Sequence, residues 1–200
     1  MQRSAIGIRV HSGWGALVAV AGNGAGMEVV DRRRVEIINP RKPGVAQPFH
    51  FAERLEISKA HEHVTRCAVA SKSLALAALQ EVVRQLQTQD YEAAGIAILL
   101  SSGRPLPAFE KILAAHTLIH AAEGEFFRQA FRDAAAELKI AVTGIRERDL
   151  DAQAKAVMGK AAPGVHKRIA DLGRVLGPPW TADQKSAALA AALVLASRND

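Results

Sequence analysis

Apolar and polar side chains alternate along the first 39 residues, in three runs separated by glycine-containing breaks. The runs are residues 5–10, 16–21 and 27–38, and the breaks are His11-Ser12-Gly13 and residues 22–26 (GNGAG). Alternation with a period of two is typical of strands that bury one face, and short glycine-containing breaks are typical of hairpin turns. The pattern predicts a three-stranded antiparallel meander.

A helical period replaces this alternation further along the chain. Apolar residues recur at three- and four-residue spacing from about residue 53 to 86, which predicts one long amphipathic helix. Residues 93–100 (AAGIAILL) are almost continuously apolar, as expected of a central strand covered on both faces. Pro105 and Pro107 then begin a second long helix, predicted to reach about residue 138 with a kink at Gly124.

The last third of the chain is mostly helical. Residues 140–145 have the composition of a strand, and two short helical stretches follow at 150–158 and 165–176. Thr181 with Gln184 three residues later forms a capping box, which predicts the start of a final alanine-rich helix reaching residue 196.

The predicted order is three strands, helix, strand, helix, strand and helices. Within it, residues 5–20 (AIGIRVHSGWGALVAV), 120–145 (HAAEGEFFRQAFRDAAAELKIAVTGI) and 182–196 (ADQKSAALAAALVLA) resemble segments of the RuvC-type Holliday-junction resolvases, in the ribonuclease-H-like superfamily. The resemblance covers nearly the whole chain and rests on order and spacing. It implies one α/β domain over residues 1–200, a five-stranded mixed sheet (three-strand antiparallel meander plus two parallel strands) flanked by helices.

Length and composition agree with a single domain. Two hundred residues that are 49% hydrophobic are enough for one sizeable core. No apolar run reaches the roughly 18 residues of a membrane span, and the start of the chain leads into a predicted strand instead of a signal peptide. We therefore expect a cytoplasmic protein without membrane contact. The lone Cys67 indicates a small buried residue and excludes an intramolecular disulfide.

The formal net charge of +6 favours a polyanionic partner such as nucleic acid. The cations that suggest this concentrate at Arg32-Arg33-Arg34, Arg41-Lys42, Arg146, Arg148, Lys160, Lys167 and Arg168. They predict either a phosphate-contacting surface or ordinary solvated faces. Aromatic residues make up only 4% of the chain, which argues against a base-stacking platform.

The resemblance also assigns positions to a two-metal nuclease site. It implies carboxylates on the first strand, at the end of the fourth strand and on the last helix, which hold two metal ions. These positions fall on Arg9, on or near Ser101 and Ser102, and on Asp183 and Ser186. Asp183 alone is acidic, so we predict that nuclease activity is lost. Asp183 also suits a helix first turn for electrostatic reasons alone.

A second group of residues is independent of the resemblance. His116, His120 and Glu123 stand at i, i+4 and i+7, which places them on one helix face, in an apolar stripe expected to face the core. Two imidazoles and a carboxylate suit a divalent metal such as zinc, or a general base lining a pocket. The alternatives are a buried hydrogen-bonded network, or a helix break at Gly124 that exposes Glu123 and Glu125.

Two further motifs carry less chemistry. His61 and His63 fall on opposite edges of the apolar stripe of the first long helix, so they do not chelate together, although either could join the other histidines across a helix pair. The glycines of residues 22–26 lie between two predicted strands and do not begin a helix, which excludes a phosphate-binding loop.

Three functions remain open. The first is a nuclease fold that has lost its metals and retains weak nucleic-acid binding. The second is an enzyme with a relocated site at His116, His120 and Glu123, a metal-dependent hydrolase or nuclease, with Asp183 as a further catalytic candidate. The third is a nucleotide-binding relative of the actin-like and sugar-kinase proteins, although these have an aspartate where Arg9 stands. A homodimer is left open.

Overall fold

The computed structural model describes residues 1–23, 26–101 and 105–197. Its centre is a five-stranded mixed sheet with the strand order β3-β2-β1-β4-β5. The strands are β1 (Gln2–His11), β2 (Trp14–Ala21), β3 (Glu28–Glu36), β4 (Tyr91–Leu100) and β5 (Val142–Arg146). The first three are antiparallel neighbours, whereas β4 is parallel to β1 and β5 is parallel to β4. The predicted antiparallel meander, parallel pair and five-stranded mixed sheet are confirmed.

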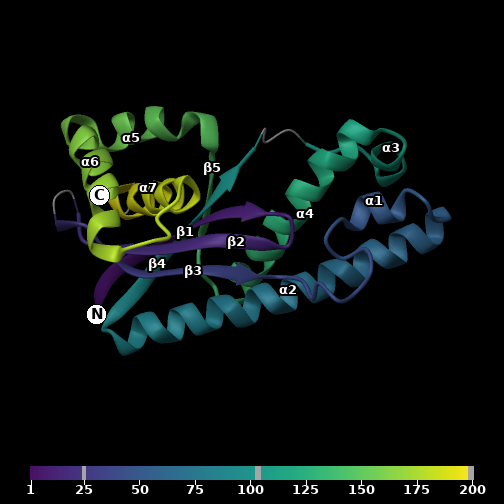
Figure 1. Ribbon diagram of the computed structural model, residues 1–200, viewed down its shortest axis with the longest axis horizontal. Coiled ribbons are helices and arrows are strands. Elements are labelled where there is room, and N and C mark those ends of the chain that lie inside the picture. Colours follow the sequence, from purple (N-terminus) through teal and green to yellow (C-terminus); the bar gives the residue numbers. More distant parts are fainter. Residues whose placement is uncertain (24–25, 102–104, 198–200) are drawn as a thin grey trace.

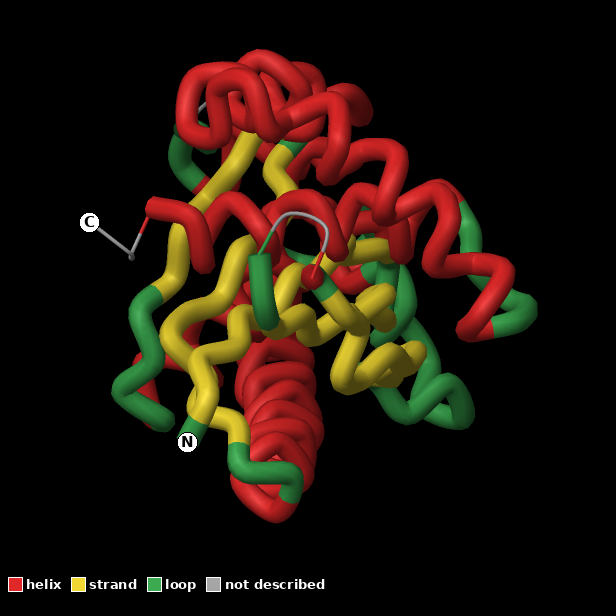
Figure 2. Tube along the Cα trace, turned by 90° about the vertical axis from the view of Figure 1, so that its left-hand side faces the viewer, coloured by secondary structure: helices red, strands yellow, loops and turns green. Residues whose placement is uncertain are grey.

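Helices cover both faces of this sheet. They are α1 (Pro48–Ala52), α2 (Ile57–Thr88), α3 (Phe109–Leu113), α4 (His116–Glu137), α5 (Leu150–Met158), α6 (Ala162–Leu176) and α7 (Ala182–Ser197), with 3-10 turns η2 (Glu147–Asp149) and η3 (Gly159–Ala161). Figure 1 shows α7 on one side of the strands and the long α2 on the other. Figure 2, turned by 90°, shows the sheet lying between these helical layers.

The two faces bury separate apolar clusters. On the α7 side, Val18, Ala97 and Leu99 pack with the apolar residues of α5, α6 and α7. On the opposite side, α2 and α4 pack against the sheet, and Phe127 and Phe131 of α4 are fully buried there. Strands β1, β2 and β4 are therefore covered on both faces, which explains their nearly unbroken apolar sequences.

Close contact between α7 and β1 depends on a glycine. A Cβ atom at Gly7 would lie 1.8 Å from the carbonyl oxygen of Ala187, which no side chain tolerates. The small residues of α7 extend this contact, since Ala187, Ala188, Ala190 and Ala191 are all fully buried. The start of α7 is thereby held against the carboxyl-terminal half of β1. At the end of β1, Gly13 makes the turn into β2 with a φ of +81°.

The prediction of one long helix with a kink at Gly124 is partly wrong. The stretch is divided into α3 and α4 at Ala115, whose backbone is extended (φ −140°, ψ 112°), and α4 continues through Gly124 without a break. Alanine favours helix, so nothing in the local sequence marks this division. Its effect is that α1, α3 and the start of α4 form a small cluster of their own, centred on Phe49 and Ile119.

Within the described ranges, no helix is both long enough and apolar enough to cross a bilayer. The predicted capping of the last helix is confirmed in one of its two bonds, because the backbone N–H of Thr181 donates to Gln184 Oε1 at 2.9 Å. The glycine-rich loop predicted at residues 22–26 lies partly outside the described residues.

Candidate functional site

Arg9 lies near the carboxyl end of β1 and contacts two carboxylates. Its Nε and Nη2 atoms donate to Oε1 and Oε2 of Glu147 at 3.0 and 3.2 Å, which is a bidentate pairing. Its Nη1 atom also donates to Oδ1 of Asp183 in the first turn of α7. The guanidinium therefore bridges two acidic side chains, one from η2 and one from α7. We call Arg9, Glu147, Asp183 and His11 the arginine site.

His11 completes the arginine site from the end of β1. Its Nε2 atom lies 2.8 Å from Oδ2 of Asp183, so both carboxylate oxygens of Asp183 are engaged. The His11 ring stacks on Trp14 with ring centroids 4.2 Å apart, and the Arg34 guanidinium lies 3.6 Å from the centre of the Trp14 ring. Trp14, Arg34 and Asp183 also border a surface hollow of about 330 Å³.

The charges of the arginine site compensate one another. Burial lowers the pKa of Arg9, but the hydrogen bonds and charges of Glu147 and Asp183 outweigh that effect and raise its pKa above the ordinary value. An arginine at this position stays protonated at every physiological pH. The cation that these carboxylates would otherwise attract is therefore supplied by the chain itself.

Several of the positions that the resemblance assigned to metal ligands are neutral. Ser101 is exposed just beyond the end of β4, Ser102 lies outside the described residues, and Ser186 is half-buried one turn after Asp183. Glu147 was not predicted as part of the site. It directly follows β5, and the carboxyl ends of parallel neighbours meet at one edge of a sheet, so this rule could have found it.

The predicted histidine face is divided by the structure. His116 and His120 lie in the first turns of α4, exposed to solvent, with their Nε2 atoms 3.0 Å apart. They meet His50 of α1, whose ring centroid is 5.3 Å from that of His116 and 4.7 Å from that of His120. One nitrogen from each of the three rings lies within 4.8 Å of the others. We call these three residues the histidine cluster.

Glu123 contacts His50, whereas the prediction grouped it with His116 and His120. Its Oε1 atom accepts hydrogen bonds from the backbone N–H groups of Phe49 and His50 at 2.9 and 3.1 Å, and lies 3.2 Å from Nδ1 of His50. Its side chain is 6% exposed, and Oε2 has no hydrogen-bond partner in the part of the chain that the structure describes. Burial raises the pKa of Glu123, although the bonds from His50 and Phe49 oppose the shift. Of the predicted trio, only Glu123 points into the protein.

The other two histidines of interest lie apart from each other, as predicted. His61 stacks on Phe109, with ring centroids 3.9 Å apart. His63 is buried, stacks on Phe51 and lies 3.6 Å from the sulfur of Cys67. Neither residue joins the histidine cluster among the described residues.

Most residues of the predicted basic patch pair with other groups of the protein. Arg32 donates to the backbone carbonyls of Leu176, Gly177 and Pro179, Arg33 pairs with Asp31, and Arg34 pairs with Glu36. The exposed pair Arg41-Lys42 differs, because no ion pair to either side chain occurs in the described part of the chain.

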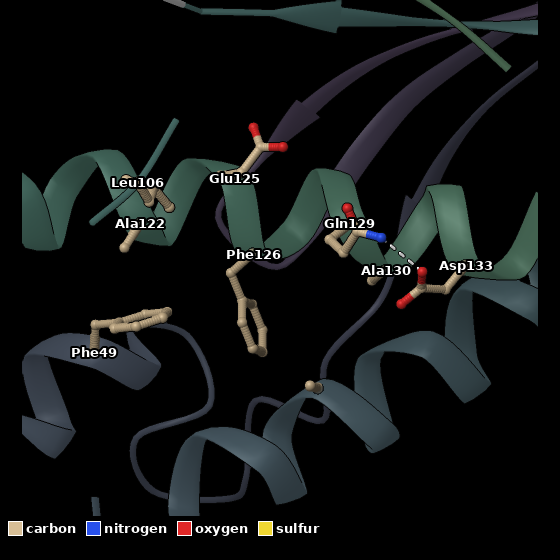
Figure 3. Close-up of a pocket in the computed structure, with 9 residues that line it drawn as sticks. Phe49, Leu106, Ala122, Glu125, Phe126, Gln129, Ala130 and Asp133 are labelled. Atoms are coloured by element: carbon tan, nitrogen blue, oxygen red, sulfur yellow. Dashed lines mark hydrogen bonds between the residues drawn. The ribbon is translucent and has the colours of Figure 1, made fainter. Parts of the chain in front are cut away.

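A further cavity of about 220 Å³ lies between α1, α2 and α4. Figure 3 shows the Phe126 ring extending from α4 toward α2, and the Phe49 ring facing it from α1, while Glu125 points away from the cavity. Phe49 thus contributes its ring to this cavity and its backbone N–H to Glu123. Two polar residues of the lining, Gln129 and Asp133, hydrogen-bond to each other at 2.7 Å.

Comparison with solved structures supports the fold. The chain matches Thermus thermophilus RuvC with a TM-score of 0.55 and 16% identity, over 98% of this chain and 95% of that chain. The same values apply to T. thermophilus RuvC in complex with Holliday junction substrate. No family model matches the sequence, and no curated protein matches it. At this level of identity the similarity shows a RuvC-like, ribonuclease-H-like fold.

Proposed function

We propose that this protein is a RuvC-like domain that has lost two-metal nuclease activity and binds nucleic acid weakly through exposed cations. The observation that carries the first part is the position of Arg9, whose guanidinium bridges Glu147 and Asp183. Two-metal cleavage needs carboxylate oxygens that are free to coordinate Mg²⁺. Here those oxygens accept hydrogen bonds from a permanent cation.

The residues at the arginine site do not fit a pair of divalent ions. A metal ion would have to displace the bidentate Arg9–Glu147 pair, and the second oxygen of Asp183 is held by His11. Ser101 and Ser186 offer only neutral hydroxyl groups where the resemblance implies carboxylates. The function proposed here is therefore binding without cleavage at this site.

Support for nucleic-acid binding comes from two observations. One similar structure is that of T. thermophilus RuvC in complex with Holliday junction substrate. This chain carries a net charge of +6, although most of its clustered arginines are paired internally. Because these clustered arginines are already paired, we expect the affinity to be low. Arg41 and Lys42 are adjacent, exposed and without an ion pair among the described residues, which suits them to phosphate contacts.

The loss of cleavage is tested with purified protein, branched and duplex DNA, and Mg²⁺ or Mn²⁺. We expect no cleavage. In parallel, thermal melts compare wild type with Arg9→Ala, which frees Glu147 and Asp183. Adding Mg²⁺ should raise the melting temperature of Arg9→Ala but not that of wild type. Cleavage by wild type that is abolished in Asp183→Asn would refute the proposal.

Nucleic-acid binding is tested by fluorescence anisotropy between 50 and 200 mM salt. Raising the salt over this range should weaken binding by about 3.5-fold for each phosphate contact, because counterions are released on binding. The double variant Arg41→Ala/Lys42→Ala should bind more weakly than wild type. Arg84→Ala is the matched control, since Arg84 already pairs with Glu81. Affinity that does not depend on salt would contradict this mode of binding.

A further inference from the structure

We propose that His50, His116 and His120 bind one divalent first-row transition metal ion, with Zn²⁺ the expected ion and solvent as the fourth ligand. The three residues come from two elements far apart in the sequence, yet each brings one ring nitrogen to within 4.8 Å of the other two. This site is separate from the arginine site and uses none of its residues.

The spacing of the nitrogens suits a metal ion. Zinc–imidazole bonds of about 2.0 to 2.1 Å in tetrahedral geometry place two ligand nitrogens roughly 3.3 Å apart. His116 Nε2 and His120 Nε2 are already 3.0 Å apart, as the i, i+4 positions of a helix allow. The His50 nitrogen requires only a small movement to complete the triangle, and the exposed rings of His116 and His120 leave the site open to solvent.

Glu123 acts as the positioning residue for His50. With Nδ1–H of His50 donating to Glu123 Oε1 at 3.2 Å, the Nε2 lone pair of His50 is free to coordinate. A carboxylate that holds the far nitrogen of a ligating histidine is the usual support for such a ligand. The same Oε1 atom fixes α1 through the N–H groups of Phe49 and His50, so the ring is held from two directions.

The buried carboxylate also argues for a nearby cation. Glu123 is 6% exposed, and its Oε2 atom has no partner among the described residues. An ionised carboxylate in this position is stabilised by positive charge close to it. A divalent ion held by the three imidazoles would supply such charge.

The type of ligand restricts the metal. Three imidazoles suit zinc, copper or nickel, whereas Mg²⁺ and Ca²⁺ prefer oxygen ligands. Three protein ligands with an open fourth position are characteristic of zinc centres that activate water, in contrast to closed structural sites with four protein ligands. The ligand at the open fourth position is therefore water or a small anion.

The experiment measures metal binding by metal-free wild-type protein. Isothermal titration with Zn²⁺ should give one site per chain, and Co²⁺ should produce the intense visible absorption of a tetrahedral complex. His116→Ala and His120→Ala should each weaken binding at least 100-fold. Both side chains are exposed, so these variants should fold, as checked by circular dichroism. Glu123→Gln should weaken binding by 10- to 100-fold.

The matched controls are His61→Ala and His166→Ala, which remove a half-exposed histidine elsewhere. Both should bind Zn²⁺ as wild type does. The proposal is overturned if folded wild type binds no stoichiometric Zn²⁺, if His120→Ala binds unchanged, or if a control loses as much affinity as His120→Ala. Should His50→Ala fail to fold, His116→Ala and His120→Ala still decide the question.

Discussion

The arginine site and the histidine cluster differ in how the negative charge of their carboxylates is balanced. At the arginine site, two carboxylates meet a cation that belongs to the chain, so the group is complete without any ligand. At the histidine cluster, three imidazoles converge beside a buried carboxylate whose second oxygen has no hydrogen-bond partner among the described residues, and the ion proposed there comes from solution. The comparison teaches that the position expected to bind metal by resemblance is electrostatically satisfied, whereas the incomplete site lies elsewhere.

The two sites also depend on different packing. The arginine site is assembled where α7 docks on β1 and where β5 ends beside β4. The histidine cluster is assembled by α1 and α4, beyond the ends of the strands (Figure 1). A change in one docking surface should therefore disturb one site and spare the other.

The largest effect is expected from Gly7→Ala. The new Cβ atom would lie 1.8 Å from the carbonyl oxygen of Ala187, so α7 must move away from β1 and carry Asp183 from Arg9. We expect a loss of about 3 kcal/mol or more in the free energy of unfolding, measured by urea denaturation. Gly164→Ala, which has open space around its Cβ position, should not destabilise the protein. Zn²⁺ binding by folded Gly7→Ala should persist, and its loss would link the two sites.

Glu123→Ala comes next and acts on the histidine cluster alone. It leaves the N–H groups of Phe49 and His50 without their acceptor, which should cost about 2 to 3 kcal/mol. The melting temperature should fall by about 4 to 12 °C. Glu123→Gln retains a carbonyl acceptor and should recover most of this loss. Equal destabilisation by both substitutions would show that the charge of Glu123, and not its hydrogen bonding, stabilises α1.

A smaller loss is expected from Arg9→Lys at the arginine site. Lysine keeps the charge but cannot form the two parallel hydrogen bonds to Glu147 while also reaching Asp183. We expect about 1 kcal/mol of destabilisation by chemical denaturation. Arg9→Met, which removes the charge, should cost more. If Arg9→Met proved as stable as wild type, the two carboxylates would not need a cation.

The smallest effect is expected from Arg34→Ala, at the edge of the arginine site. Its guanidinium lies over Trp14, but the Arg34 side chain is 54% exposed, so the cation–π contact should contribute only about 0.5 to 1 kcal/mol. Arg84→Ala, an exposed arginine without an aromatic neighbour among the described residues, should change stability by less. The two melts, compared directly, measure the contact. Identical melts would show that the contact between Arg34 and Trp14 does not stabilise the protein.

Many of the strands and helices were predictable because the local spacing of apolar residues determines them. The alternation over residues 5–38, the apolar run at 93–100 and the capping of the last helix by Gln184 all appear in the structure. The division at Ala115 was not predictable, since its neighbours are good helix formers and the break is imposed by packing around Phe49. The pairing of the arginine run at residues 32–34 was not predictable either, because Arg32 donates to a carbonyl group 145 residues away in the sequence.

By itself, the sequence determined which chemistry is missing and which donors are present. The resemblance to RuvC-type resolvases places Arg9 where a metal-binding carboxylate is expected. His116 and His120 share a helix face whatever surrounds them, because helical spacing is local. Only the tertiary structure decided the partners. It brought Glu147 to Arg9 and His50 to the other two histidines, and it turned Glu123 inward. The physical reason is that contacts between elements depend on how faces pack against the sheet, and no local period along the chain encodes that arrangement.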